Sequence, residues 1–225
     1  MTNILLSRSH FSQFKEDLER IILPKHRVVV LAFSFFSKHL RTKEEYESFY
    51  HPGQEYRQKI NNEFAAYGIK DEQIFWISYY STTKDEAIKQ IKQADILYFP
   101  GGAPDQMMDR IEEWDLTEVL EKHRKIYMGS SAGAMIQLET YHISPDQDYK
   151  TFRLEKGLNL INDFFIEVHY SKRKKQKKAM RKMRKAYYKP IYSIPDDGCL
   201  IVFDGVIRPI HPARQIYTKT GVVKV

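Results

Sequence analysis

Short apolar runs alternate with amphipathic stretches along the first 140 residues of the chain. The runs have the length and the β-branched or aromatic content of strands buried on both faces. The predicted strands are 4–7, 26–36, 73–80, 94–102 and 124–129. Between them, apolar residues recur three or four positions apart, as on the buried face of a helix. The predicted helical stretches are 11–22, most of 42–68, 85–93 and 105–114. Strands separated by helices indicate an α/β fold with a mainly parallel sheet flanked by helices.

The last third of the chain departs from this alternation. A polar loop at 144–150 is followed by a strand-like run at 163–170 and then by a strongly basic segment. The run CLIVF-DG-VIRPI at 199–210 predicts a C-terminal β-hairpin, because Asp-Gly between two apolar runs favours a tight turn. No low-complexity linker or internal repeat interrupts the pattern. We therefore expect one domain over residues 1–225.

Composition excludes several classes of protein. Hydrophobic residues make up 42% of the chain and charged residues 29%, as in globular proteins. No apolar run reaches eighteen residues, so no membrane span is expected. The N-terminus is too briefly apolar for a signal peptide, and we expect a cytoplasmic location. A single cysteine, Cys199, excludes an internal disulfide framework and a cysteine-based zinc site. We expect neither a metal nor a cofactor, and leave open whether the chain forms a homodimer.

The net charge of +7 comes from one segment. Of the 36 Lys and Arg residues, eleven lie in 171–189, which leaves 25 against 29 acidic residues and a charge of about −4 elsewhere. The segment has Ala179, Met180 and Met183 at helical spacing, so it predicts an amphipathic helix with a cationic face. This face is either simply solvated or binds nucleic acid, anionic lipid or another polyanion. Alternatively, Lys172 and Arg173 help to hold an anionic substrate.

The stretch KIYMGSSAGAMIQL contains the candidate nucleophile. Gly129-Ser130-Ser131-Ala132-Gly133 has the spacing G-x-S-x-G between a predicted strand and a predicted helix, which is the nucleophile-elbow pattern. This spacing selects Ser131 as the nucleophile and leaves Ser130 as the variable position. The backbone N–H of Ala132 is one candidate oxyanion donor. A plain tight turn of small residues is the alternative interpretation.

A second glycine turn, Gly101-Gly102, follows the preceding predicted strand. Carboxyl ends of parallel strands form the ligand-binding edge of such a sheet, so this turn can face Ser131. We expect the N–H of Gly102 to complete the oxyanion site, and Gly101 to line the substrate pocket.

A serine nucleophile needs a base and an acid that orients the base. His169 ends the apolar run DFFIEV and therefore emerges at the end of a strand, which makes it the best of the eight histidines. Asp146 and Asp148 in the loop SPDQDYK are candidates for the acid, and so is Glu167, two residues before His169. The sequence does not separate these three.

Taken together, these motifs resemble the dipeptidase E and cyanophycinase family of serine peptidases. The resemblance rests on LYFPGG, MGSSAGAM, GLNLINDFFIEVHY and IPDDGCLIVFDG. It implies the class I glutamine amidotransferase-like fold, Ser131 as nucleophile, His169 as base, and Asp146, or its neighbour Asp148, as acid. It also implies metal-independent cleavage of small peptides that begin with aspartate. The chain departs from the family at Ala103-Pro104-Asp105, where an added negative charge is unfavourable for an acidic substrate.

We therefore interpret the chain as a serine-type peptidase acting on small peptides, possessing a Ser-His-Asp triad and forming an acyl-enzyme. The alternative is a catalytically inactive family member that binds a partner through the basic helix 171–189.

Overall fold

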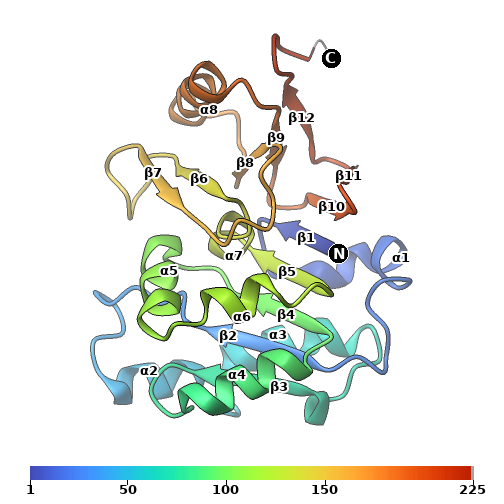
Figure 1. The fold of residues 1–225 in the computed structure, drawn as a ribbon, viewed down its shortest axis with the longest axis vertical. Helices are drawn as coiled ribbons and strands as arrows, with labels where there is room; N and C mark the ends of the chain where they lie inside the picture. Colours follow the sequence, from blue (N-terminus) through green and yellow to red (C-terminus); the bar gives the residue numbers. More distant parts are fainter. Residues whose placement is uncertain (224–225) are drawn as a thin grey trace.

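The computed structural model describes residues 1–223, and its centre is a seven-stranded sheet (Figure 1). The strand order is β11-β10-β1-β5-β4-β2-β3. These strands are β1 (Thr2–Leu6), β2 (Val28–Ala32), β3 (Ile74–Ser78), β4 (Ile96–Phe99), β5 (Ile126–Ser130), β10 (Cys199–Phe203) and β11 (Val206–Ile210). Strands β1 to β5 run parallel, whereas β10 runs antiparallel to β1 and forms a hairpin with β11. The predicted parallel sheet and the C-terminal hairpin are both confirmed.

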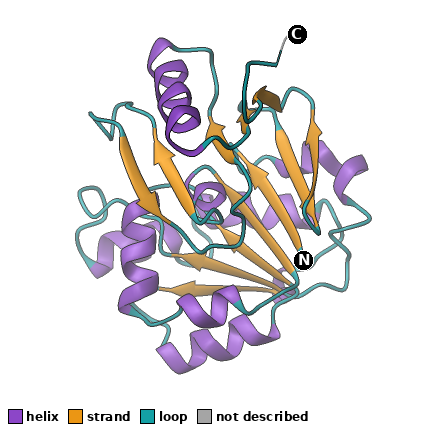
Figure 2. Ribbon diagram, turned by 45° about the horizontal axis from the view of Figure 1, so that its top comes forward, coloured by secondary structure: helices purple, strands orange, loops and turns teal. Residues whose placement is uncertain are grey.

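Helices cover both faces of this sheet (Figure 2). The helices are η1 (Phe11–Phe14), α1 (Lys15–Leu18), α2 (Lys43–Tyr50), α3 (Glu55–Ala65), η2 (Asp71–Gln73), α4 (Lys84–Gln93), α5 (Pro104–Glu113), α6 (Thr117–Glu121), α7 (Ala132–Met135) and α8 (Lys174–Tyr187). In β2, Val28 and Val30 pack in the core beneath α2 and α3, whereas Val29 and Leu31 pack in the core beneath α4, α5 and α6. Every residue of β2 is buried, which explains its continuous apolar sequence.

Two smaller sheets lie above one face of the main sheet, at the top of Figure 1. One pairs β6 (Thr140–Ile143) with β7 (Arg153–Lys156), and the other has the order β12-β9-β8. The latter contains β8 (Phe165–Val168), β9 (Ile191–Ile194) and β12 (Arg214–Tyr217). Only β8 among these was expected from sequence, and its membership of a separate sheet was not. The strands are four residues long, too short for a clear apolar period.

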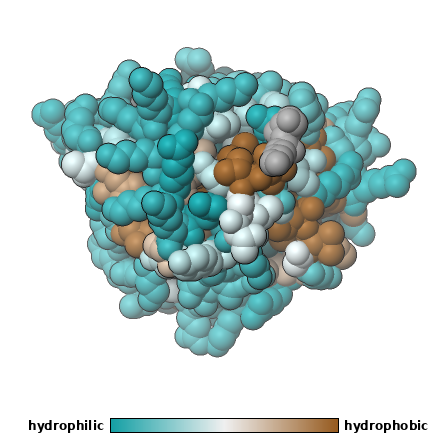
Figure 3. Space-filling model, turned by 90° about the horizontal axis from the view of Figure 1, so that it is seen from above, coloured by the Kyte–Doolittle hydropathy of each residue, from teal (hydrophilic) through white to brown (hydrophobic). Residues whose placement is uncertain are grey.

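Helix α8 confirms the amphipathic helix predicted within 171–189. Its apolar side buries Ala179, Met180 and Met183 against β6 and β8, while most of its Lys and Arg residues are exposed. In the view from above, hydrophilic side chains cover much of the surface on the side that carries α8 (Figure 3). None of the described helices is both long and apolar enough to cross a membrane.

The carboxyl ends of the parallel strands bring three loops together. Strand β4 leads into Gly101–Ala103, and β5 leads into Ser131, whose N–H donates to the carbonyl of Leu6 at the end of β1 (2.8 Å). The end of β8 approaches the same edge, since the N–H of His169 donates to the hydroxyl of Ser7 (2.8 Å). The fold thus collects the predicted functional residues at one edge of the sheet.

Candidate active site

Ser131 occupies a strained corner between β5 and α7. Its backbone has φ 51° and ψ −110°, a combination that a residue with a side chain rarely adopts. The turn is so tight that a Cβ on Gly133 would lie 1.8 Å from the carbonyl oxygen of Phe99. The second glycine of the G-x-S-x-G pattern is therefore required by close backbone approach.

Ser130 and Ser131 have different environments. Ser130 is 1% exposed, and its Oγ accepts a hydrogen bond from the hydroxyl of Tyr98 (3.1 Å) and lies 3.1 Å from Oγ of Ser9. Ser131 lines both cavities of the site, and its Oγ lies beside a histidine ring, whereas Ser130 lines only the second cavity. Ser130 is thus held in a buried hydroxyl network, and Ser131 is the serine available to a substrate.

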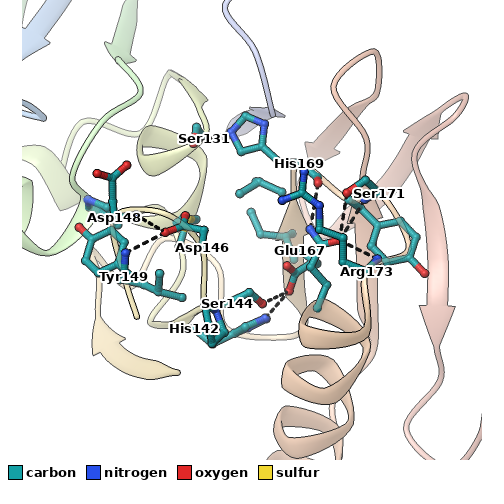
Figure 4. A pocket seen from close by; sticks show the side chains of 18 of the residues that line it. Ser131, His142, Ser144, Asp146, Asp148, Tyr149, Glu167, His169, Ser171 and Arg173 are labelled. Carbon is teal, nitrogen blue, oxygen red and sulfur yellow. Dashed lines mark hydrogen bonds and ion pairs between the residues drawn. The ribbon is translucent and has the colours of Figure 1, made fainter. Parts of the chain in front are cut away.

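His169 contacts Ser131 directly. Its Nε2 lies 2.8 Å from Oγ of Ser131, and Figure 4 shows the ring directed at the serine. Its backbone has φ 50° and is held from both sides, because its N–H donates to Ser7 and its carbonyl accepts from Nε2 of Gln176 (2.9 Å). Gln176, in the first turn of α8, is buried and also accepts from the N–H of Ser171 (3.0 Å). The start of the basic helix therefore fixes the turn that carries His169.

Asp196 is the carboxylate that contacts the other ring nitrogen. Its Oδ1 lies 2.5 Å from Nδ1 of His169, and its Oδ2 accepts from Nη2 of Arg8 (2.9 Å). Partial burial acts to raise the pKa of Asp196, but the hydrogen bonds from Arg8 and His169 outweigh it and hold the pKa below its usual value. Asp196 is therefore an ionised partner for His169 at neutral pH.

Asp146 and Asp148 do not contact His169, contrary to our expectation for the orienting acid. Oδ1 of Asp146 accepts from the N–H groups of Asp148 and Tyr149 (both 2.8 Å), which is a local turn interaction. The carboxylate of Asp148 pairs with Nζ of Lys38 at 2.6 Å. Both residues line the cavity beside Ser131, but Asp196 occupies the position that the sequence had assigned to one of them.

Glu167, the third candidate acid, faces away from His169 into a buried cluster. Its Oε2 lies 2.7 Å from Nε2 of His142 and accepts from Oγ of Ser144 at 2.9 Å (Figure 4). Glu167 and His142 are 4% and 3% exposed. Strand alternation would place residues 167 and 169 on one face, but β8 ends at Val168 and His169 lies beyond it in a turn of positive φ, so the two side chains point in different directions.

Gly102 and Ala132 both lie next to Ser131, Gly102 in the lining of the same cavities and Ala132 as the following residue of the chain. Among the described residues, no intramolecular acceptor is found for the N–H of either one. Gly102 has φ 147°, and a Cβ there would lie 1.9 Å from the carbonyl oxygen of Ser34. Ser34 holds this loop, since its Oγ donates to the carbonyl of Gly101 (2.8 Å) and its carbonyl accepts from Ala103 (2.6 Å). Two free N–H groups near one hydroxyl can stabilise a developing oxyanion.

Two cavities meet at Ser131, with volumes of about 640 and 700 Å³. Arg173 lines the first cavity and Gly101 lines the second, in agreement with their predicted proximity to the site. Lys172 lines neither of them, because it is exposed in a turn of positive φ next to Arg173. Of the two basic residues expected near the substrate, the structure therefore brings only Arg173 to the site.

The negative charge of Asp105 is balanced within the protein. Its carboxylate pairs with Nη1 of Arg153 (2.6 Å) and accepts from the hydroxyl of Tyr149 (2.5 Å), and its side chain is 14% exposed. Asp105 does not belong to the lining of the first cavity, although its neighbour Pro104 does. The departure Ala103-Pro104-Asp105 therefore does not place a free negative charge in the cavity.

Cys199 lies outside the site, and the described residues offer no cluster of metal ligands. Cys199 is fully buried in β10, and burial raises the pKa of its thiol, as expected for an inert strand residue. The described residues contain no group of three His, Cys, Asp or Glu side chains placed to hold a metal ion.

Sequence reasoning missed two residues of the site, Asp196 and Arg8. The available signal for Asp196 was the pair Asp196-Asp197 directly after the apolar stretch IYSIP, near the end of the chain. Arg8 follows the first strand in ILLSRS and carried no signal by itself.

The chain belongs to peptidase family S51, whose family model matches residues 47–209. It is thus a serine peptidase. Among solved structures, it is similar to a candidate peptidase E protein from Listeria monocytogenes EGD-e, with a TM-score of 0.66 and 16% identity over 93% of this chain and 97% of that one. It is also similar to a peptidase from an acI-B1 Actinobacterium, with a TM-score of 0.63 and 13% identity over 100% and 96% of the two chains. At these identities the similarity concerns the fold. The search of curated proteins gave no match.

Proposed function

We propose that the chain hydrolyses small peptides, including dipeptides that begin with aspartate, through Ser131, His169 and Asp196. The observation that supports this most directly is the line of contacts from Oγ of Ser131 through both ring nitrogens of His169 to Asp196. In such an arrangement the acid fixes the tautomer of the histidine and stabilises its protonated form.

In the proposed reaction, Oγ of Ser131 attacks the carbonyl carbon of the scissile amide while Nε2 of His169 takes the hydroxyl proton. The N–H groups of Gly102 and Ala132 hold the oxyanion, each such donor being worth about 10²–10³-fold in rate. His169 then protonates the leaving amine, and an ester of Ser131 with the N-terminal half remains. Water, deprotonated by His169, hydrolyses this ester and restores Ser131.

The position of Arg173 favours a substrate with an acidic residue before the scissile bond. It lines the first cavity and makes no ion pair with a described acidic residue, so its guanidinium is available to a substrate carboxylate. The basic face of α8 gives no specific sign of a nucleic-acid ligand, and nothing in the comparisons favours an inactive binding protein.

Intact-mass analysis after treatment with a fluorophosphonate tests the proposal without knowledge of the substrate. We expect one adduct on the wild type and none on Ser131→Ala or His169→Ala. Hydrolysis of L-aspartyl-L-leucine by the wild type alone would then establish the substrate class. An unlabelled wild type, or an equally labelled Ser131→Ala, would contradict the proposal.

A further inference from the structure

Ser131 lies where two cavities of different charge meet. Both cavities are lined in part by Arg8, Gly102, Ser131, His169 and Asp196, so each begins at the candidate catalytic groups. A peptide whose scissile carbonyl reaches Ser131 can therefore place one half in each cavity. The charges that belong to only one of them distinguish the two halves.

The first cavity is rich in carboxylates. Asp146, Asp148 and Glu167 line it, and Figure 4 shows these three around the space beside Ser131. Oε2 of Glu167 is bound to His142 and Ser144, whereas no partner of its Oε1 occurs among the described residues. Arg173 lines this cavity and not the second one, whereas Arg8 lines both. This environment suits the α-ammonium group of a substrate, and Arg173 can receive an acidic side chain.

The second cavity has a different charge pattern. Lys59, an exposed residue of α3, and His10 line it without reaching the first cavity. Lys59 makes no ion pair among the described residues. His10 lies 3.4 Å from Glu63, which also accepts from the N–H of Ser12. The acids of this cavity are Asp196, already bound to Arg8 and His169, and the exposed Asp197. Lys59 is thus a positive charge with no described carboxylate oxygen within 4.0 Å, and Asp197 likewise makes no ion pair among the described residues.

We propose that Lys59 binds the free α-carboxylate of the residue that leaves during cleavage. This inference rests on the proposed function and assigns the second cavity as its leaving-group side. A dipeptide carries its ammonium and its carboxylate on opposite sides of the scissile bond. The carboxylates Asp146, Asp148 and Glu167 line only the first cavity, whereas Lys59 lines only the second, beside Asp197. A carboxylate at Lys59 gains a charge-assisted hydrogen bond, whereas an amide or a continuing peptide chain carries no charge there.

Paired substrates test this assignment. L-aspartyl-L-leucine and its C-terminal amide differ only in the carboxylate. We expect Lys59→Gln to lower kcat/KM for the free acid by roughly tenfold to a hundredfold, mainly through KM, and to leave the amide unchanged. Lys59→Arg retains the charge and should retain most of the preference. Lys89→Gln, which removes an exposed lysine of α4 outside both cavities, is the matched control.

Protection of Ser131 from fluorophosphonate labelling by the same two ligands gives a second measurement, which does not require turnover. In the wild type, the free acid should slow labelling more than the amide does. In Lys59→Gln, the two ligands should slow labelling to the same extent. Equal protection by both ligands in the wild type, no protection by either, or an equal loss of kcat/KM for both in Lys59→Gln would overturn the role of Lys59. Intact labelling in those cases would leave the proposed function standing, whereas absent labelling would remove the function itself.

Discussion

The carboxylate of Asp196 lies 2.5 Å from Nδ1 of His169, on the ring edge opposite to the one that faces Ser131. We predict that Asp196→Asn lowers kcat by about 10⁴-fold, because an amide favours the wrong histidine tautomer and cannot stabilise the imidazolium. The rate of fluorophosphonate labelling should fall in parallel. A discontinuous hydrolysis assay measures kcat, and the time course of adduct formation by intact-mass analysis measures the labelling rate on the same preparation.

Asp146→Asn and Asp148→Asn are the matched controls, since both remove a carboxylate that lines the same cavity without contacting His169. Neither should change the labelling rate by more than a few fold. Two results would contradict the role of Asp196: full activity of Asp196→Asn, or a loss of about 10⁴-fold in Asp146→Asn. Either result would indicate that the orienting acid lies in the loop 144–150.

Arg8 should set the lowest pH at which the site remains active. Although partial burial opposes it, the hydrogen bonds from Arg8 and His169 keep the pKa of Asp196 below its usual value, so this carboxylate stays ionised as the pH falls. Arg8→Gln removes one of these hydrogen bonds and a positive charge, so the pKa of Asp196 should rise and its ionised form should be lost at a higher pH. The acid limb of the labelling rate should move to higher pH in Arg8→Gln and stay near that of the wild type in Arg8→Lys. A labelling rate that is reduced by the same factor at every pH would indicate a merely structural role.

The two adjacent serines should separate stability from reactivity. Ser130→Ala removes the acceptor of the buried Tyr98 hydroxyl, a phenol whose pKa burial raises to about 12. Loss of this buried hydrogen bond should lower the free energy of unfolding by about 1–2 kcal/mol, measured by urea denaturation, while labelling continues. Ser131→Ala should show the reverse behaviour, with near-normal stability and no adduct. Loss of labelling in a folded Ser130→Ala would contradict this division.

Local patterns were sufficient for much of the fold and for all of the site except Asp196 and Arg8. Buried parallel strands have continuous apolar sequences, and in Gly129-Ser130-Ser131-Ala132-Gly133 the first glycine is required by a contact within the motif, since a Cβ there would lie 2.2 Å from the carbonyl oxygen of Gly133. His169 was found because it ends an apolar run. Each of these signals lies inside one element or at its end.

The acid could not be found in this way, because its contact joins segments 27 residues apart through pairing of β8 with β9. Asp146 resembled a triad acid in sequence, but its carboxylate is used by N–H groups of its own loop. Arg8 is more distant still, since it meets Asp196 from the other end of the chain. Sequence periodicity carries no information on which loops meet above the sheet.

Gly102 should be indispensable for activity because of a steric clash with Ser34 as well as its positive φ. Gly53 also has a positive φ, 92°, but a Cβ there would have no atom within 4 Å, so Gly53→Ala should cost only about 1–2 kcal/mol and leave labelling unchanged. In Gly102→Ala the same kind of strain is joined by a clash with the carbonyl of Ser34, which forces the loop away and displaces the Gly102 N–H from the oxyanion site. We expect labelling to slow by about 10²-fold or more, as for the loss of an oxyanion donor. Folding is checked by urea denaturation of both variants, and a Gly102→Ala variant that is folded and labelled at the wild-type rate would exclude this N–H from the oxyanion site.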